Sequence, residues 1–277
     1  MKTLLTRRDM ALVLSAGLFA RRALAADAAK IRLPLRTRVE PFKGSGAWEE
    51  VRLVREMAVS ETAVIICDMW DKHWCSGATE RVAELVSKME PVVSHARERG
   101  IRIIHSPSET MEFYKDYPQR KRILAGPQVD GPVPVPLPDA TLPIDDSDGG
   151  CDTPGDKSYT AWKRQHPGLT IGPEDLISDQ GREVYSFLRN AGIGNLLVMG
   201  VHTNMCILNR TFAIKQMTRW GLRCILVRDL TDTMYDPEDS PFVSHSQGTE
   251  LVVEHIEKHW CPTTTSGELM EALAGGG

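Results

Sequence analysis

Short apolar runs alternate with longer amphipathic segments along most of the chain. Residues 62–67 form a continuous apolar run, residues 79–99 have apolar positions at helical spacing and stop at Gly100, and residues 101–105 are again mostly apolar. A fully apolar strand is typical of a parallel sheet that is covered on both faces. This half of the chain therefore predicts a strand–helix–strand unit. Two extended segments are predicted before it, at 31–42 and 48–57.

The same alternation returns in the second half of the chain. Helices are predicted at 179–191, 206–220, 249–258 and 268–274, and strands at 196–200, 224–228 and 260–264. Strands that alternate with helices predict a doubly wound, mainly parallel α/β sheet, in one domain that spans residues 27–277. Chemistry in such sheets gathers at the carboxyl ends of the strands. Asp68, His105, the segment 200–206 and Asp229 all fall at these ends.

The stretch 195–220 carries the strongest chemical signal. It passes from an apolar strand that ends at Gly200, through a polar turn, into a helix predicted to begin at Cys206. Free N–H groups and the positive end of the helix dipole favour a thiolate over a thiol. Cys206 is therefore a candidate nucleophile, and a buried structural cysteine is the alternative.

Residues 1–26 have the pattern of an export signal. An arginine pair, Arg7 and Arg8, precedes an apolar run at 11–20 and a small-residue site at 23–25. This order is typical of a twin-arginine (Tat) signal peptide that is cleaved near Ala25. The apolar run is too short for a permanent transmembrane helix. We therefore expect a periplasmic or secreted protein.

Charge and composition limit the classes of molecule that the protein is expected to bind. The formal net charge is -4, and the chain has no polybasic segment. Nucleic acid, anionic membranes and stable membrane insertion are therefore not expected, and a small-molecule substrate is the default ligand. No cofactor is predicted, because no Cys or His spacing suggests a zinc site.

Export would place the six cysteines in an oxidising compartment. Cys67 and Cys224 lie inside apolar runs and are interpreted as core residues. Cys75, Cys151 and Cys261 lie in predicted loops and are candidates for one disulfide, but their spacing does not fix a pairing.

Residues 126–166 interrupt the alternation of strands and helices. This insert has many prolines, followed by an acidic run at 145–152. Loops of this length in a compact domain are usually functional or disordered. We expect the insert to lie over the active edge of the sheet, as a lid or as an oligomer contact.

Two motifs give the chain a resemblance to a known superfamily. A strand ends at Asp68 in VIICDMWD, and a later strand leads into GVHTNMC, a G-x-x-T-x-x-C pattern that ends at Cys206. The chain resembles the isochorismatase-like cysteine hydrolases, which include nicotinamidases, N-carbamoylsarcosine amidohydrolases and isochorismatases. The similarity covers residues 62–264 apart from the insert. It implies a six-stranded parallel sheet between two layers of helices, and a homo-oligomer.

The resemblance also implies roles for individual residues. Asp68 matches the general base and Cys206 the nucleophile of the family, and a cis peptide bond is implied between Val201 and His202. The backbone N–H groups of His202 and Cys206 would form the oxyanion hole. The implied reaction is hydrolysis of a C–N bond in a small amide.

The family's catalytic lysine has no direct counterpart. The matching segment, residues 174–180, contains no lysine. Lys72, close after Asp68, and Lys157 or Lys163, in the insert, are candidates to replace it, with Lys72 and Lys163 preferred, although each also fits an exposed surface lysine. If none reaches Cys206, an arginine or a histidine must support the thiolate, or amidase activity has been lost.

Several aromatic and polar side chains are predicted to contact the substrate. These residues are Trp70, His73, Trp74, His105 and Thr203. The metal-binding pair of nicotinamidases is missing after the second strand, and Asp71, His73 and His105 leave a divalent metal open as the weaker alternative. We predict no metal.

Two other functions are weighed against an exported cysteine hydrolase. One is an isochorismatase-type vinyl-ether hydrolase, against which Cys206 argues. The other is a non-catalytic periplasmic binding protein on the same scaffold, which the missing lysine supports.

Overall fold

The computed structural model describes residues 29–133 and 139–275. The predicted export signal at residues 1–26 and part of the insert lie outside these ranges. Of the helices in the described ranges, none has the length and apolar character needed to cross a membrane.

Eight strands in the described residues form one sheet, in the order β2-β1-β8-β7-β6-β3-β4-β5. The six strands from β8 to β5 are parallel, and β1 pairs antiparallel with both β8 and β2. The strands are β1 (Lys30–Val39), β2 (Glu49–Ala58), β3 (Thr62–Cys67), β4 (Arg102–Ser106), β5 (Leu176–Ile177), β6 (Asn195–Val201), β7 (Arg223–Asp232) and β8 (Thr263–Thr264). The six parallel strands confirm the predicted sheet, and the β1–β2 hairpin extends it.

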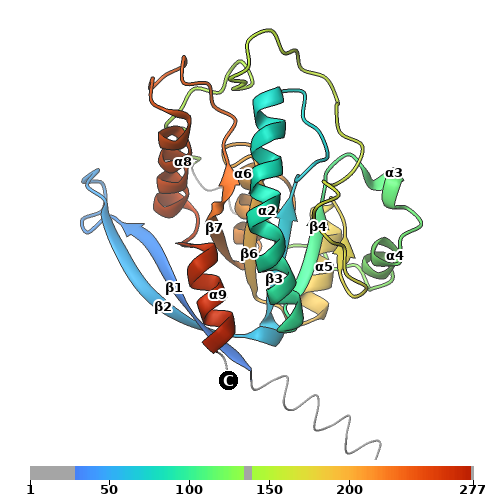
Figure 1. Ribbon diagram of the computed structural model, residues 1–277. Coiled ribbons are helices and arrows are strands. Elements are labelled where there is room, and N and C mark those ends of the chain that lie inside the picture. Colours follow the sequence, from blue (N-terminus) through green and yellow to red (C-terminus); the bar gives the residue numbers. More distant parts are fainter. Residues whose placement is uncertain (1–28, 134–138, 276–277) are drawn as a thin grey trace, which may run out of the picture.

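Helices cover both faces of this sheet, which makes three layers (Figure 1). Alternate residues of the fully buried β3 point to opposite faces: Val64 and Ile66 pack with α2 and α9, whereas Ala63 and Ile65 pack with α4, α5, α6, α7 and α8. The helices are α2 (Ser76–Glu98), α3 (Met111–Tyr114), α4 (Pro118–Leu124), α5 (Gly181–Asn190), α6 (Cys206–Asn209), α7 (Ile214–Arg219), α8 (His245–His259) and α9 (Ser266–Gly275), with a 3-10 turn, η1 (Val59–Glu61).

The prediction of a single helix at 206–220 is wrong. Helix α6 ends after four residues, because Arg210 is extended, with φ −60° and ψ 147°. A second helix, α7, starts at Ile214. Apolar periodicity continues through both helices and therefore does not reveal the break between them.

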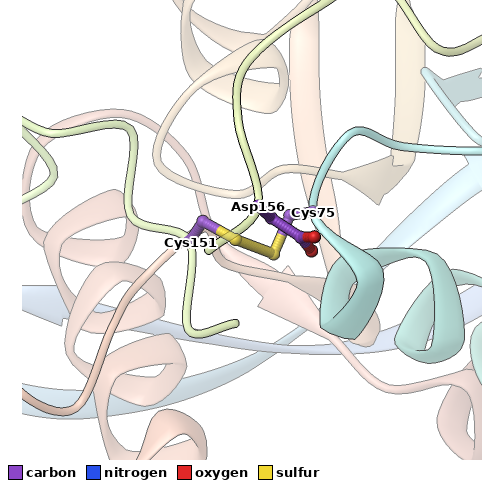
Figure 2. A group of neighbouring side chains, drawn as sticks. All are labelled: Cys75, Cys151 and Asp156. Carbon is purple, nitrogen blue, oxygen red and sulfur yellow. A yellow bond between two sulfur atoms is a disulfide. The ribbon is translucent and has the colours of Figure 1, made fainter. Parts of the chain in front are cut away.

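The insert is tied to the start of α2 by a disulfide and two hydrogen bonds. A disulfide joins Cys75 and Cys151, whose Cα atoms are 5.7 Å apart (Figure 2). The backbone N–H of Ser76 donates to Asp156 Oδ2 at 2.7 Å, and that of Gly77 donates to Thr153 Oγ1 at 3.0 Å. These bonds satisfy N–H groups that have no partner inside the helix. Of the three loop cysteines, Cys261 is thus left free, and it is buried.

Removing this disulfide is expected to destabilise the protein. The bond closes a loop across a sequence separation of 76 residues. A crosslink over a loop of this length contributes about 2–4 kcal/mol, largely by restricting the unfolded chain. The Cys75→Ser/Cys151→Ser protein should therefore melt several degrees below the wild type in calorimetry. Adding a phosphine reductant should lower the melting temperature of the wild type and leave that of the double variant unchanged; a reductant-insensitive wild type would contradict the pairing.

Candidate active site

Asp68 is a fully buried carboxylate at the carboxyl end of β3. Its Oδ1 accepts the backbone N–H of Ser108 at 2.7 Å, and its Oδ2 accepts Nε–H of Arg210 at 2.9 Å. Burial raises the pKa of Asp68, and the charge of Arg210 opposes that rise. The carboxylate is therefore held in place by two donors, at the sheet edge where the sequence predicted a base.

The turn between β6 and α6 is fixed by close contacts with the neighbouring strands. Gly200 has φ +117°, and a Cβ at this position would lie 2.0 Å from the carbonyl oxygen of Cys67 on β3. Only glycine fits such an approach. The Val201–His202 peptide bond is cis, which confirms the prediction.

Thr203 holds this turn against β7. Its backbone N–H donates to the carbonyl of Asp232 at 2.8 Å, and its hydroxyl bonds the hydroxyl of Thr231 at 2.7 Å. The side chain is fully buried. The hydroxyl that was predicted to bind substrate therefore has a partner inside the protein, and Thr203 positions the turn.

Cys206, the first residue of α6, is half-buried and its side chain bonds the Asp68 carboxylate. Burial and the nearby negative charge of Asp68 raise the pKa of the thiol, although the charge of Arg210 and a backbone hydrogen bond from His202 oppose them. The raised pKa favours the protonated thiol at rest, against the thiolate expected at a helix start. A helix of four residues offers little dipole, and the adjacent carboxylate outweighs it.

Arg210 supplies the cation at this site. Besides its bond to Asp68, its Nη2 lies 3.4 Å from Oε1 of Glu109, and its side chain is 31% exposed. Burial lowers the pKa of Arg210, but the charge of Asp68 and its hydrogen bond outweigh burial and raise it. The break after α6 allows this contact, because the extended Arg210 backbone turns the side chain towards Asp68.

The two lysines preferred from the sequence do not make this contact. Lys72 and Lys163 are both exposed. The backbone N–H of Lys163 donates to Asp71 Oδ1 at 3.0 Å, outside the Asp68 and Cys206 pair. Arg210 was missed although it lies only four residues after Cys206, because the break in the helix that turns it towards Asp68 leaves no trace in the apolar pattern.

A cluster of rings stands beside the pair. Trp162 of the insert stacks on Trp70 at a centroid distance of 4.2 Å and on His73 at 5.7 Å. His73 meets His202 edge-on at 4.9 Å and Trp74 at 5.3 Å. The indole N–H of Trp70 donates to the carbonyl of Ser108, whose own N–H binds Asp68. We call Trp70, His73, Trp162 and His202 the ring cluster.

The two imidazoles of the ring cluster are neutral at physiological pH. Burial lowers the pKa of His73 to about 4 and that of His202 to about 3, with a further contribution from nearby cationic groups. The nearest arginine on this side, Arg81, bonds Asp152 at 2.6 Å and Asp232 at 2.9 Å, so its charge is paired.

A cleft of about 550 Å³ opens beside His73 and Trp74. Its charged lining residues are Lys72, Lys157, Glu80 and Asp156, two of each sign. Clefts of this size hold small molecules. His73 and Trp74, both predicted to contact substrate, line this cleft, and His73 also belongs to the ring cluster.

His105, also predicted to contact substrate, is instead part of the protein interior. It is fully buried on β4. Its Nδ1 bonds Gln165 Oε1 at 2.8 Å and its Nε2 bonds Asp175 Oδ2 at 2.9 Å. Both ring nitrogens are occupied, so His105 links the end of the insert to the loop before β5.

The hydrogen bonds that join His105 and Asp175 make the free energy of unfolding depend on pH in the acid range. Burial raises the pKa of Asp175, but bonds from His105, Arg97 and the backbone of Gly172 outweigh it and lower the pKa to about 2. The stabilisation is complete above the ordinary value of 3.8 and is lost as pH falls toward about 2. It amounts to about 2 kcal/mol.

The Asp175→Asn protein should therefore unfold at lower denaturant concentration than the wild type at pH 7. Its unfolding free energy should also change less between about pH 4 and about pH 2. The adjacent Glu174, which is 70% exposed, provides the control: Glu174→Gln should keep the pH dependence of the wild type. Equal acid sensitivity of the Asp175→Asn protein would contradict this role.

Within residues 29–133 and 139–275, one group of three potential metal ligands gathers: Cys75, Cys151 and Asp156, with ligand atoms within 4.8 Å of one another. The two sulfurs are joined in the disulfide and are therefore not thiolate ligands (Figure 2). Asp71, His73 and His105, the alternative raised by the sequence, do not form such a group.

Comparisons with known proteins support the fold. No family model and no curated protein matches the sequence. A cysteine hydrolase from Pseudomonas syringae pv. phaseolicola 1448A is 18% identical, with a TM-score of 0.52, over 80% of this chain and 96% of that one. An isochorismatase from Pseudomonas putida KT2440 is 15% identical, with a TM-score of 0.47, over 76% of this chain and 90% of that one. An isochorismatase family protein from Burkholderia thailandensis is 15% identical, with a TM-score of 0.45, over 78% of this chain and 96% of that one. On the first of these similarities, the chain has the same α/β fold as that cysteine hydrolase.

Proposed function

We propose that this protein is a cysteine hydrolase that cleaves a C–N bond in a small-molecule amide. The observation that carries the proposal is the contact of three groups at the carboxyl edge of the sheet: the Asp68 carboxylate, the Cys206 thiol and the Arg210 guanidinium. The fold alone does not fix the chemistry, but a base, a nucleophile and a cation in contact supply what acyl transfer needs.

The first half of the reaction forms a thioester. Asp68 takes the Cys206 proton as the sulfur attacks the amide carbon, so that a free thiolate need not accumulate beside the carboxylate. The backbone N–H groups of His202 and Cys206 would stabilise the oxyanion of the tetrahedral intermediate. Protonated Asp68 then gives its proton to the leaving nitrogen, and the C–N bond breaks.

The second half of the reaction returns the enzyme to its starting state. Asp68 takes a proton from water, the resulting hydroxide attacks the thioester carbon, and the C–S bond breaks. The sulfur regains its proton from Asp68. Arg210 keeps Asp68 ionised between these steps. It thereby takes the cationic role of the lysine that the sequence lacks.

Ammonia release and a covalent intermediate test the proposal together. The mature, oxidised protein is incubated with a panel of primary amides and ureides, ammonia is measured, and samples quenched in acid are examined by mass spectrometry. We expect ammonia from at least one amide and an acyl mass on the peptide that contains Cys206. Ligand binding without ammonia and without an adduct would refute hydrolysis and favour the non-catalytic binding protein.

Export and assembly remain predictions. The twin-arginine signal predicts a periplasmic or secreted protein, and the resemblance predicts a homo-oligomer. Neither enters the chemistry proposed for Asp68 and Cys206.

A further inference from the structure

Two buried polar atoms of the ring cluster have no hydrogen-bond partner. They are Nε1 of Trp162 and Nε2 of His202, and His202 is only 2% exposed. A buried donor or acceptor left unpaired costs free energy that a bound molecule can recover. The Trp70 indole, in contrast, already donates to Ser108.

These two atoms flank His73 at the site of the proposed chemistry. Trp162 stacks on the His73 ring at 5.7 Å, and His202 meets its edge at 4.9 Å. The Nδ1 of His73 already accepts the backbone N–H of Cys75 at 3.2 Å. His202 also reaches the nucleophile through its backbone bond to Cys206. A small molecule that bonds the His202 imidazole would thus lie close to the nucleophile.

The charged groups around the ring cluster are paired with one another. Arg81 is paired with Asp152 and Asp232, and Arg210 with Asp68 and Glu109. The adjoining cleft has two lysines and two carboxylates. A charged substrate would therefore find no unpaired group of opposite charge among these arginines and their carboxylate partners, and would lose hydration without a matching partner.

We propose that the ring cluster is the specificity pocket for the acyl half of the substrate, which rests on the proposed function. Trp162 Nε1–H donates a hydrogen bond to an oxygen of that acyl group, and His202 Nε2 bonds the substrate as a neutral imidazole. The substrate class is a small uncharged amide whose acyl chain carries a second hydrogen-bonding oxygen.

Binding of four matched amides tests the pocket. Acetoacetamide has the additional oxygen, butyramide has a similar size without it, malonamate is an anion, and β-alaninamide is a cation. Dissociation constants are measured by calorimetry on the Cys206→Ala protein, which prevents turnover. We expect acetoacetamide to bind about tenfold more tightly than butyramide, because only acetoacetamide pairs the buried N–H.

The Trp162→Phe substitution, added to Cys206→Ala, keeps the stacked ring and removes the donor. It should abolish the preference for acetoacetamide and leave butyramide binding unchanged. Trp260→Phe is the matched control: its indole nitrogen is also buried without a partner, but its ring lies against Lys215 and Arg219. That substitution should leave the preference intact.

Three results would overturn the pocket: equal binding of acetoacetamide and butyramide, tighter binding of malonamate or β-alaninamide, and an equal loss for both neutral amides in the Trp162→Phe protein. Absence of binding by all four probes would overturn it as well. The proposed function fails separately, through lack of ammonia and of a Cys206 adduct in the wild type, whereas calorimetry reports on the pocket without the thiol.

Discussion

The Cys206→Ala protein is expected to bind amides but to have a kcat at least about 10⁴-fold below that of the wild type. The half-buried sulfur is the nucleophile in the proposed route, and alanine cannot form the thioester. Asp68, the cis turn and Arg210 would remain, so substrate binding should survive. Ammonia release and calorimetry on the same preparation separate the two effects.

A second free cysteine provides the matched control for this loss. Cys261 is buried, unpaired and packed near Cys224 in the core. Cys261→Ala should lower stability, because it leaves a small cavity, but should keep kcat close to that of the wild type. Turnover that survives in the Cys206→Ala protein would refute Cys206 as the nucleophile, whatever the control shows.

Replacing Arg210 with glutamine is expected to lower kcat/KM by about 100-fold at neutral pH. The guanidinium opposes the effect of burial on the pKa of Asp68. Without it that pKa rises further, and Asp68 becomes protonated at a higher pH. The acid limb of the pH–rate profile should therefore move to higher pH, so that activity falls more at pH 6 than at pH 8.

Two further variants separate this electrostatic effect from loss of structure. Arg210→Lys keeps the charge but loses the Nε–H bond to Asp68, and should recover part of the rate and of the profile. Arg182→Gln removes an arginine from an exposed ion pair with Asp130 and should change neither. An Arg210→Gln profile that coincides with the wild type would show that Arg210 does not act through Asp68.

The sheet and the positions of Asp68 and Cys206 were predictable because their signals are local. Continuous apolar runs identify the parallel strands, and Asp68 and Cys206 follow β3 and β6 within a few residues. The carboxyl ends of parallel neighbours meet at one edge, and β3 is paired with β6. Two residues far apart in sequence were thus placed together correctly.

The remaining parts of the site depend on contacts that periodicity does not contain. The position of Arg210 follows from a helix break at one residue. Trp162 lies in the insert, which has no regular pattern, and His105 is held by Gln165 and Asp175, which come from two loops. Likewise, the spacing of Cys75, Cys151 and Cys261 allowed several pairings, and only the folded chain selects one.

The candidate site is built from two separate parts of the chain, the strand ends and the tethered insert. The strand ends hold Asp68 and Cys206, whereas the insert adds Trp162 and is fastened at Cys75 and along the first turn of α2. On the proposed function, substitutions in the insert would reshape what the cleft accepts while Asp68 and Cys206 keep their geometry. Such a chain would acquire new substrates by exchanging one surface segment, and directed evolution of this protein should begin there.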